Sequence, residues 1–130
     1  MPKISRPPSE SEIPNPICNY VNLIKERKTP YYDVIKHILL EMEHHYLKAG
    51  KTEVIYSINP RRLQEEIEDL IKSEKLTSVN ISRTILALFY GTNLKKDEDF
   101  YVTTSSRGRK NYHVKLNSQT LNTFKRFVML

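Results

Sequence analysis

DFYVTTSSRGRKNYHVKL, residues 99–116, is the stretch of this sequence that decides its fold. Two runs of alternating, β-branched and aromatic residues, 99–106 and 110–116, flank the triplet Arg107-Gly108-Arg109. Such runs are typical of strands. Glycine tolerates the positive φ that a tight connection between antiparallel strands requires. The stretch therefore predicts a two-stranded hairpin with cations at its tip.

Upstream of this hairpin, the sequence predicts three helices and one short strand. Thr29-Pro30 and Asn59-Pro60 are start signals because proline fits the first helical position, and Gly50 offers a stop. Helices are expected over 29–49, from Asn59, and over 78–90, with a strand at 52–58 (TEVIYSI). Apolar residues at helical spacing should face a core: Tyr31, Ile35, Ile38, Leu39, Met42 and Tyr46, then Leu63, Ile67, Leu70 and Ile71, then Ile81, Ile85, Leu88 and Phe89.

The two ends of the chain differ in character from this middle part. Residues 1–14 hold four of the seven prolines and little apolar surface, so a disordered tail is expected there. Asn15-Pro16 then starts an amphipathic helix over 15–28. Asn117-Ser118 starts a last helix over 117–130, which serves packing or dimerisation. The domain proper is expected to be 29–116.

Length and composition restrict the class of protein. The chain has 130 residues and a net charge of +6, which suits one domain with one core. A single cysteine, Cys18, cannot form an internal disulfide. No apolar stretch approaches the roughly 18 residues of a membrane span, and residues 1–29 lack the apolar centre of a signal peptide. A cytoplasmic protein without membrane contact is therefore expected.

The order of predicted elements and three segments resemble a winged helix-turn-helix domain between Thr29 and Leu116. The segments are SINPRRLQEEIEDL (57–70), SVNISRTILALF (78–89) and YVTTSSRGRKNYHVKL (101–116). The resemblance implies an α+β, mainly α fold, with a three-helix core, a short strand, a two-stranded β-wing and extra terminal helices. The Lys- and Ile-rich style is similar to that of regulators from archaea and their plasmids or viruses.

This resemblance implies that the chain is a transcriptional regulator that binds double-stranded DNA. Such a protein would be associated with the nucleoid. Helix 78–90 would be the recognition helix in the major groove, and 99–116 would be the wing on the backbone or minor groove. On a helical wheel Asn80, Arg83 and Ala87 lie opposite the core stripe. Arginine pairs with guanine and asparagine with adenine. The candidate DNA-binding residues are Arg61, Arg62, Ser78, Asn80, Ser82, Arg83, Thr84, Arg107, Arg109 and Lys110.

Charge is distributed unevenly along the chain. Residues 1–29 carry +2, residues 30–77 carry −2, and residues 78–130 carry +6, from nine basic and three acidic side chains. The surplus therefore lies on the expected recognition helix, wing and last helix. The simpler interpretation of the charged tip at Arg107-Gly108-Arg109 is a soluble turn without a partner.

Three apolar residues complicate the expected recognition helix. Val79, Leu86 and Tyr90 also point outward on the wheel, which favours a protein contact or a different helix phase. An alternative function is therefore a winged-helix protein-interaction module, or an accessory DNA-binding factor, in a replication, partition or transcription complex.

A homodimer is the other expected association. Leu40 and Leu47 form an apolar strip opposite the core stripe of helix 29–49. The last helix carries more apolar residues than one short helix needs: Leu121, Phe124, Phe127 and Val128. A dimer would bind a palindromic site.

Catalysis, metals and cofactors are not expected. The sequence has no P-loop and no Ser-His-Asp spacing, and its three glycines can hardly build a phosphate cradle. His37, Glu41 and His44 share one helical face, but without HExxH they are better interpreted as solvated surface than as zinc ligands. Most tyrosines fit packing positions, whereas Tyr101, near the wing, stays open as a base-stacking residue.

Overall fold

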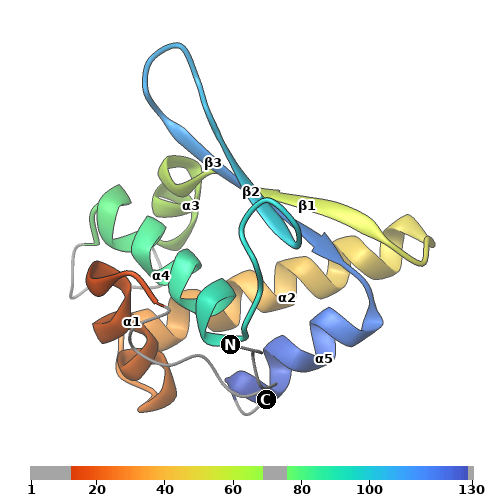
Figure 1. Cartoon of the computed structure of the whole chain (residues 1–130), viewed down its shortest axis with the longest axis horizontal. Coiled ribbons are helices and arrows are strands. Elements are labelled where there is room, and N and C mark those ends of the chain that lie inside the picture. Colours follow the sequence, from red (N-terminus) through yellow and green to blue (C-terminus); the bar gives the residue numbers. More distant parts are fainter. Residues whose placement is uncertain (1–12, 69–75, 129–130) are drawn as a thin grey trace, which may run out of the picture.

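The computed structural model describes residues 13–68 and 76–128. Within these residues the chain forms five helices and one three-stranded antiparallel sheet (Figure 1). The elements are α1 (Asn15–Lys25), α2 (Tyr31–Ala49), β1 (Val54–Ile58), α3 (Pro60–Ile67), α4 (Ser78–Gly91), β2 (Phe100–Thr104), β3 (Lys110–Leu116) and α5 (Ser118–Phe127). The predicted mixed, mainly helical class is confirmed, and each predicted helix and strand has a counterpart.

Local capping explains most of the element boundaries. Asn59 Oδ1 accepts hydrogen bonds from the N–H groups of Arg61 at 3.0 Å and Arg62 at 3.1 Å, which starts α3. Asn117 caps α5 in the same way, through the N–H of Thr120. These caps satisfy N–H groups that have no partner inside the helix. For α1 the sequence prediction was wrong in detail, because Pro14 rather than Asn15 precedes the helix and offers no side-chain acceptor.

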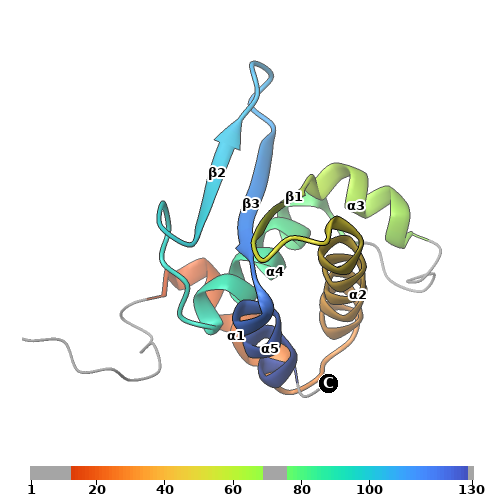
Figure 2. The ribbon, with the colours of Figure 1, turned by 90° about the vertical axis from the view of Figure 1, so that its right-hand side faces the viewer.

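Two strands of the sheet form a hairpin that extends beyond the helices. Its strand order is β1-β3-β2, so β3 is central, and both of its partners run antiparallel to it. Beyond the end of β1 the β2–β3 hairpin continues alone and projects from the molecule (Figures 1 and 2). Its tip is closed by the N–H of Ser105, which donates to the carbonyl of Arg109 at 2.8 Å, and Gly108 has φ 78°. The predicted hairpin is confirmed.

The core lies where α4 meets the sheet and α5. The ring of Phe89 on α4 lies 4.8 Å from that of Phe100 on β2 and 6.1 Å from that of Phe124 on α5. The predicted inward residues of α4 are all buried: Ile81, Ile85, Leu88 and Phe89. Ile13 is also buried, so the folded part begins inside the segment predicted as a tail. Residues 1–12, Leu70 and Ile71 lie outside the described residues.

Helix α1 packs along one side of α4. It buries Ile17, Val21 and Ile24. A Cβ added to Gly91, at the end of α4, would lie 3.4 Å from Val21. The sequence prediction placed Ala87 on the outward face of α4, and this was wrong, because Ala87 is fully buried.

Helix α5 packs within the same chain. Leu121, Phe124 and Val128 are buried, and the hydroxyl of Tyr32 on α2 donates to the carbonyl of Val128 at 3.0 Å. The apolar surplus of this helix therefore belongs to the core of one chain, and it no longer argues for a dimer. In contrast, Leu40 and Leu47 lie opposite the core stripe and stay 64% and 70% exposed, so neither α1 nor α5 covers them. Among the described residues no helix is both long and apolar enough to cross a bilayer.

The packing of α5 can be tested with Phe124→Ala. Removing a fully buried phenylalanine ring leaves a cavity, and we expect the free energy of unfolding to fall by about 3–5 kcal/mol. Arg126→Ala, an exposed site two residues away, should change it by less than about 0.5 kcal/mol. Urea denaturation followed by circular dichroism measures both. A loss below about 1 kcal/mol for Phe124→Ala would contradict the described packing of α5.

Candidate functional site

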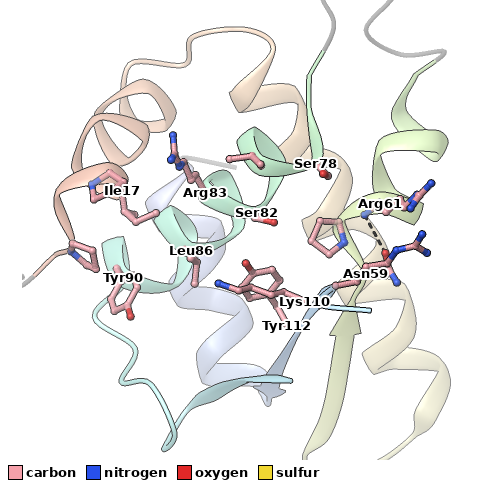
Figure 3. Close-up of a pocket in the computed structure, with 16 residues that line it drawn as sticks. Ile17, Asn59, Arg61, Ser78, Ser82, Arg83, Leu86, Tyr90, Lys110 and Tyr112 are labelled. Carbon is pink, nitrogen blue, oxygen red and sulfur yellow. Dashed lines mark hydrogen bonds between the residues drawn. The ribbon is translucent and has the colours of Figure 1, made fainter. Parts of the chain in front are cut away.

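A hollow of about 570 Å³ lies over one face of α4, between the start of α1, the start of α3 and the β2–β3 hairpin (Figure 3). We call it the α4 groove. Its lining residues are Pro14, Pro16, Ile17, Asn59, Pro60, Arg61, Ser78, Val79, Ser82, Arg83, Leu86, Tyr90, Gly108, Arg109, Lys110 and Tyr112. Segments almost a hundred residues apart in sequence therefore meet at one surface.

The α4 groove has a one-sided charge. Arg61 from α3, Arg83 from α4, and Arg109 and Lys110 from the hairpin all line it, and none of the lining residues that the structure describes is an aspartate or a glutamate. Cations gathered without a carboxylate raise the local positive potential, since nothing in the lining neutralises them. The groove is therefore suited to an anionic ligand.

Part of the groove is apolar. Figure 3 shows Ile17, Leu86 and Tyr90 toward one end, and Asn59, Arg61 and Ser78 toward the other. Val79, which also lines the groove, is 54% exposed. The groove thus has a polar, cationic end and an apolar end.

The apolar end is built around Tyr90. Its ring stands perpendicular to that of Phe100, with 5.5 Å between ring centroids, so packing restricts its orientation. Burial raises the pKa of the Tyr90 hydroxyl, and the negative charge of Asp97 raises it further. The hydroxyl therefore stays neutral at physiological pH.

Six of the ten predicted site residues come together in the α4 groove. They are Arg61, Ser78, Ser82, Arg83, Arg109 and Lys110. The sequence therefore identified most of the cations and hydroxyls of this surface. It predicted a different rotation of α4, with Asn80 and Ala87 on the outward face.

Two predicted base-reading residues face α1 instead. Asn80 Oδ1 accepts a hydrogen bond from the hydroxyl of Tyr20 on α1, at 2.9 Å. Thr84 is fully buried, and its hydroxyl donates to the carbonyl of Asn80 at 2.8 Å. Thr84 is therefore not at the surface, so the prediction that it contacts DNA is wrong, whereas Asn80 stays half-exposed with its Oδ1 engaged by α1.

Two predicted arginines lie outside the groove lining. Arg107 is exposed at the tip of the hairpin, where its N–H donates to Ser105 Oγ at 3.3 Å. The Nε of Arg62 lies 3.3 Å from Glu66 Oε1, one turn further along α3. This pair is exposed, so it contributes little to stability.

Arg62 lines a second hollow, of about 460 Å³, between α2, α3 and the sheet. Glu41 and Glu66 line it as well, so both signs of charge are present. Burial, with the charges of Glu41 and Glu66, raises the pKa of the Tyr56 hydroxyl to about 12. Unlike the α4 groove, this hollow has no dominant charge.

The histidines of α2 do not gather around a common point. His37 Nε2 lies 3.8 Å from Glu66 Oε2, and the ring of His45 stands edge-on to Tyr56 at 5.3 Å. In residues 13–68 and 76–128 no group of three His, Cys, Asp or Glu side chains could hold a metal ion.

Tyr101 takes part in sheet packing. Its ring stacks on that of His113 with 4.6 Å between centroids. His113 lies between the hydroxyls of Ser57, at 2.7 Å, and Thr103, at 2.8 Å. One face of the Tyr101 ring is therefore already covered.

The sequence carried different signals for the lining residues that it did not assign. Val79, Leu86 and Tyr90 were visible as apolar residues on the outward side of the wheel. The contribution of Pro14, Pro16 and Ile17 had no local signal, because it depends on where α1 packs against a helix sixty residues further along the chain.

Comparisons of the chain with protein-family models, with curated proteins and with solved structures found no match. A function for this chain must therefore be argued from its own residues and geometry.

Proposed function

We propose that this chain is a winged-helix protein that binds double-stranded DNA through the α4 groove and the β2–β3 hairpin, and that it acts as a transcriptional regulator in the cytoplasm. The observation that carries the proposal is the gathering of four cations from three elements in one groove, with no carboxylate among its described lining residues. The sheet order β1-β3-β2, and a hairpin that follows the succession α2-β1-α3-α4, support the winged-helix interpretation.

The first half of α4 supplies the contact with the major groove. Ser78, Ser82 and Arg83 line the same face and offer hydrogen-bond donors, and the exposed Val79 offers a methyl surface. Arginine donates hydrogen bonds to guanine O6 and N7, and serine can form hydrogen bonds with several base edges. Apolar side chains contact the thymine methyl group. The residues that read bases are therefore Ser78, Ser82 and Arg83, in place of Asn80 and Thr84.

The hairpin supplies contacts with the backbone or the minor groove. Arg107, Arg109 and Lys110 lie at its projecting end, and all three are exposed. Cations at such a position reach phosphate oxygens or an adjacent minor groove. Their role is to position the protein and to strengthen binding to any sequence.

At the start of α3 a side chain, and not the backbone, contacts a DNA phosphate. The N–H groups of Arg61 and Arg62 already donate to Asn59 Oδ1, so they are not available to a phosphate. The exposed guanidinium of Arg61 lines the groove and takes this role.

A second candidate function is the docking of a protein partner in a replication, partition or transcription complex. The exposed Val79 favours it, together with Leu86 and Tyr90 in the same groove, because apolar surface is typical of protein contacts. The two functions differ in salt dependence, since only DNA binding releases several counterions.

Salt titrations of hairpin variants test the DNA proposal. The logarithm of the binding constant should fall linearly with the logarithm of the salt concentration, and Arg109→Ala and Lys110→Ala should each lower the slope by about one. Arg126→Ala on α5 removes an exposed cation far from the groove and should leave the slope unchanged. Fluorescence anisotropy of a labelled duplex measures all four proteins. Undetectable duplex binding at low salt would favour the protein-docking function.

We also propose that two copies of the chain associate through α2. Leu40 and Leu47 lie seven residues apart on its outer face and remain exposed in the single chain. Helix residues at this spacing lie on one stripe, as in coiled-coil contacts. Two copies would place two α4 grooves on one DNA molecule.

Sedimentation equilibrium tests this association. We expect a mass twice that of the 15.3 kDa chain, and Leu47→Glu should return it to the single-chain value by placing a charge in the interface. Val79→Glu, at another exposed apolar residue, should leave the mass unchanged. A single-chain mass for the unaltered protein at every concentration would exclude the dimer.

A further inference from the structure

The apolar end of the α4 groove is not accounted for by contacts with an intact duplex. Phosphates and base edges are recognised largely through hydrogen bonds and charge. Ile17 and Leu86 offer neither, yet they line the same groove as four cations. At this end, α1 contributes Pro16 and Ile17, with Pro14 just before the helix. Leu86 and Tyr90 come from α4.

Such a surface is complementary to a flat apolar group attached to an anion. An unpaired nucleotide has this chemistry, because its base exposes a π-face that stacking covers in a duplex, and its phosphate carries a charge. Aromatic side chains stack on bases of any sequence. Tyr90 is the aromatic residue placed for this, since it lines the groove and Phe100 holds its ring.

We propose that the apolar end of the α4 groove binds an unpaired nucleotide, so that the protein prefers DNA in which a duplex is interrupted by an unpaired base. This inference rests on the proposed DNA-binding function. Tyr90 stacks on the base, Leu86 packs against it, and Lys110 binds a flanking phosphate.

The charge of the groove favours a nucleotide over a peptide. Within residues 13–68 and 76–128, four cations and no carboxylate line it, and a nucleic acid carries one phosphate for each nucleotide. A peptide would have to be strongly acidic to match this density of charge. Tyr101 does not offer an equivalent site, because the ring of His113 covers one of its faces.

The test compares three DNAs that share one labelled strand: an uninterrupted duplex, the same duplex with one extra unpaired nucleotide at the centre of the complementary strand, and the labelled single strand alone. Fluorescence anisotropy gives the dissociation constant of each. We expect the interrupted duplex to bind about tenfold more tightly than the uninterrupted one, in line with the contribution of one stacked base.

Variants of the apolar end locate the effect. Tyr90→Ala and Leu86→Ala should each reduce the ratio of the two duplex affinities to about one to three. Ile55→Ala, at an exposed apolar residue of β1 outside the groove, should keep the tenfold ratio. Thermal unfolding of each variant identifies loss of the fold, and Leu86→Ala tests the proposal without disturbing the Tyr90–Phe100 contact.

The possible outcomes distinguish a failure of this inference from a failure of the proposed DNA-binding function. Equal affinity for the two duplexes would overturn the inference and leave duplex binding in place. A tenfold ratio that persists in both Tyr90→Ala and Leu86→Ala would also overturn it, because the unpaired nucleotide would then lie elsewhere. If none of the three DNAs binds at low salt, both proposals fail, and binding of the single strand alone would contradict both as well, because the interrupted duplex would then stay unbound.

Discussion

The packing of α1 along α4 is the interaction on which the functional surface depends. It buries Thr84 and Ala87, and it engages Asn80 through the hydroxyl of Tyr20. With that side of α4 covered, Ser82 and Leu86 are left to line an open groove, and the start of α1 becomes one of its walls. One helix–helix contact thus fixes both the rotation of α4 and the shape of the groove.

The sheet provides the second constraint. Because β3 lies between β1 and β2, it connects the core to the hairpin, with Val114 and Leu116 buried at one end and Lys110 exposed at the other. This continuity places Arg109 and Lys110 of the hairpin in the same groove as Arg83 of α4. The net charge of +6 after position 77 has a structural explanation, because α4 and the hairpin, which are apart in sequence, contribute to one positive surface.

Local chemistry made the elements predictable from sequence, whereas long-range packing did not. Asn59, Gly108 and Asn117 act through their own backbone neighbours, so the starts of α3 and α5 and the hairpin could be predicted. The rotation of α4 could not, because apolar residues occupy several of its sides and a wheel does not show which side another helix covers. For the same reason the apolar residues of α5 predicted burial, but not that the same chain would provide it.

Amide chemical-shift mapping of isotope-labelled protein, titrated with a short duplex, tests the central claim most directly. We predict that the largest changes occur at Ser82, Leu86 and Lys110, with Asn80 and Ala87 less affected because α1 covers them. Changes centred on the outer face of α2, or on the sheet around His113, with the groove amides unmoved, would contradict the account.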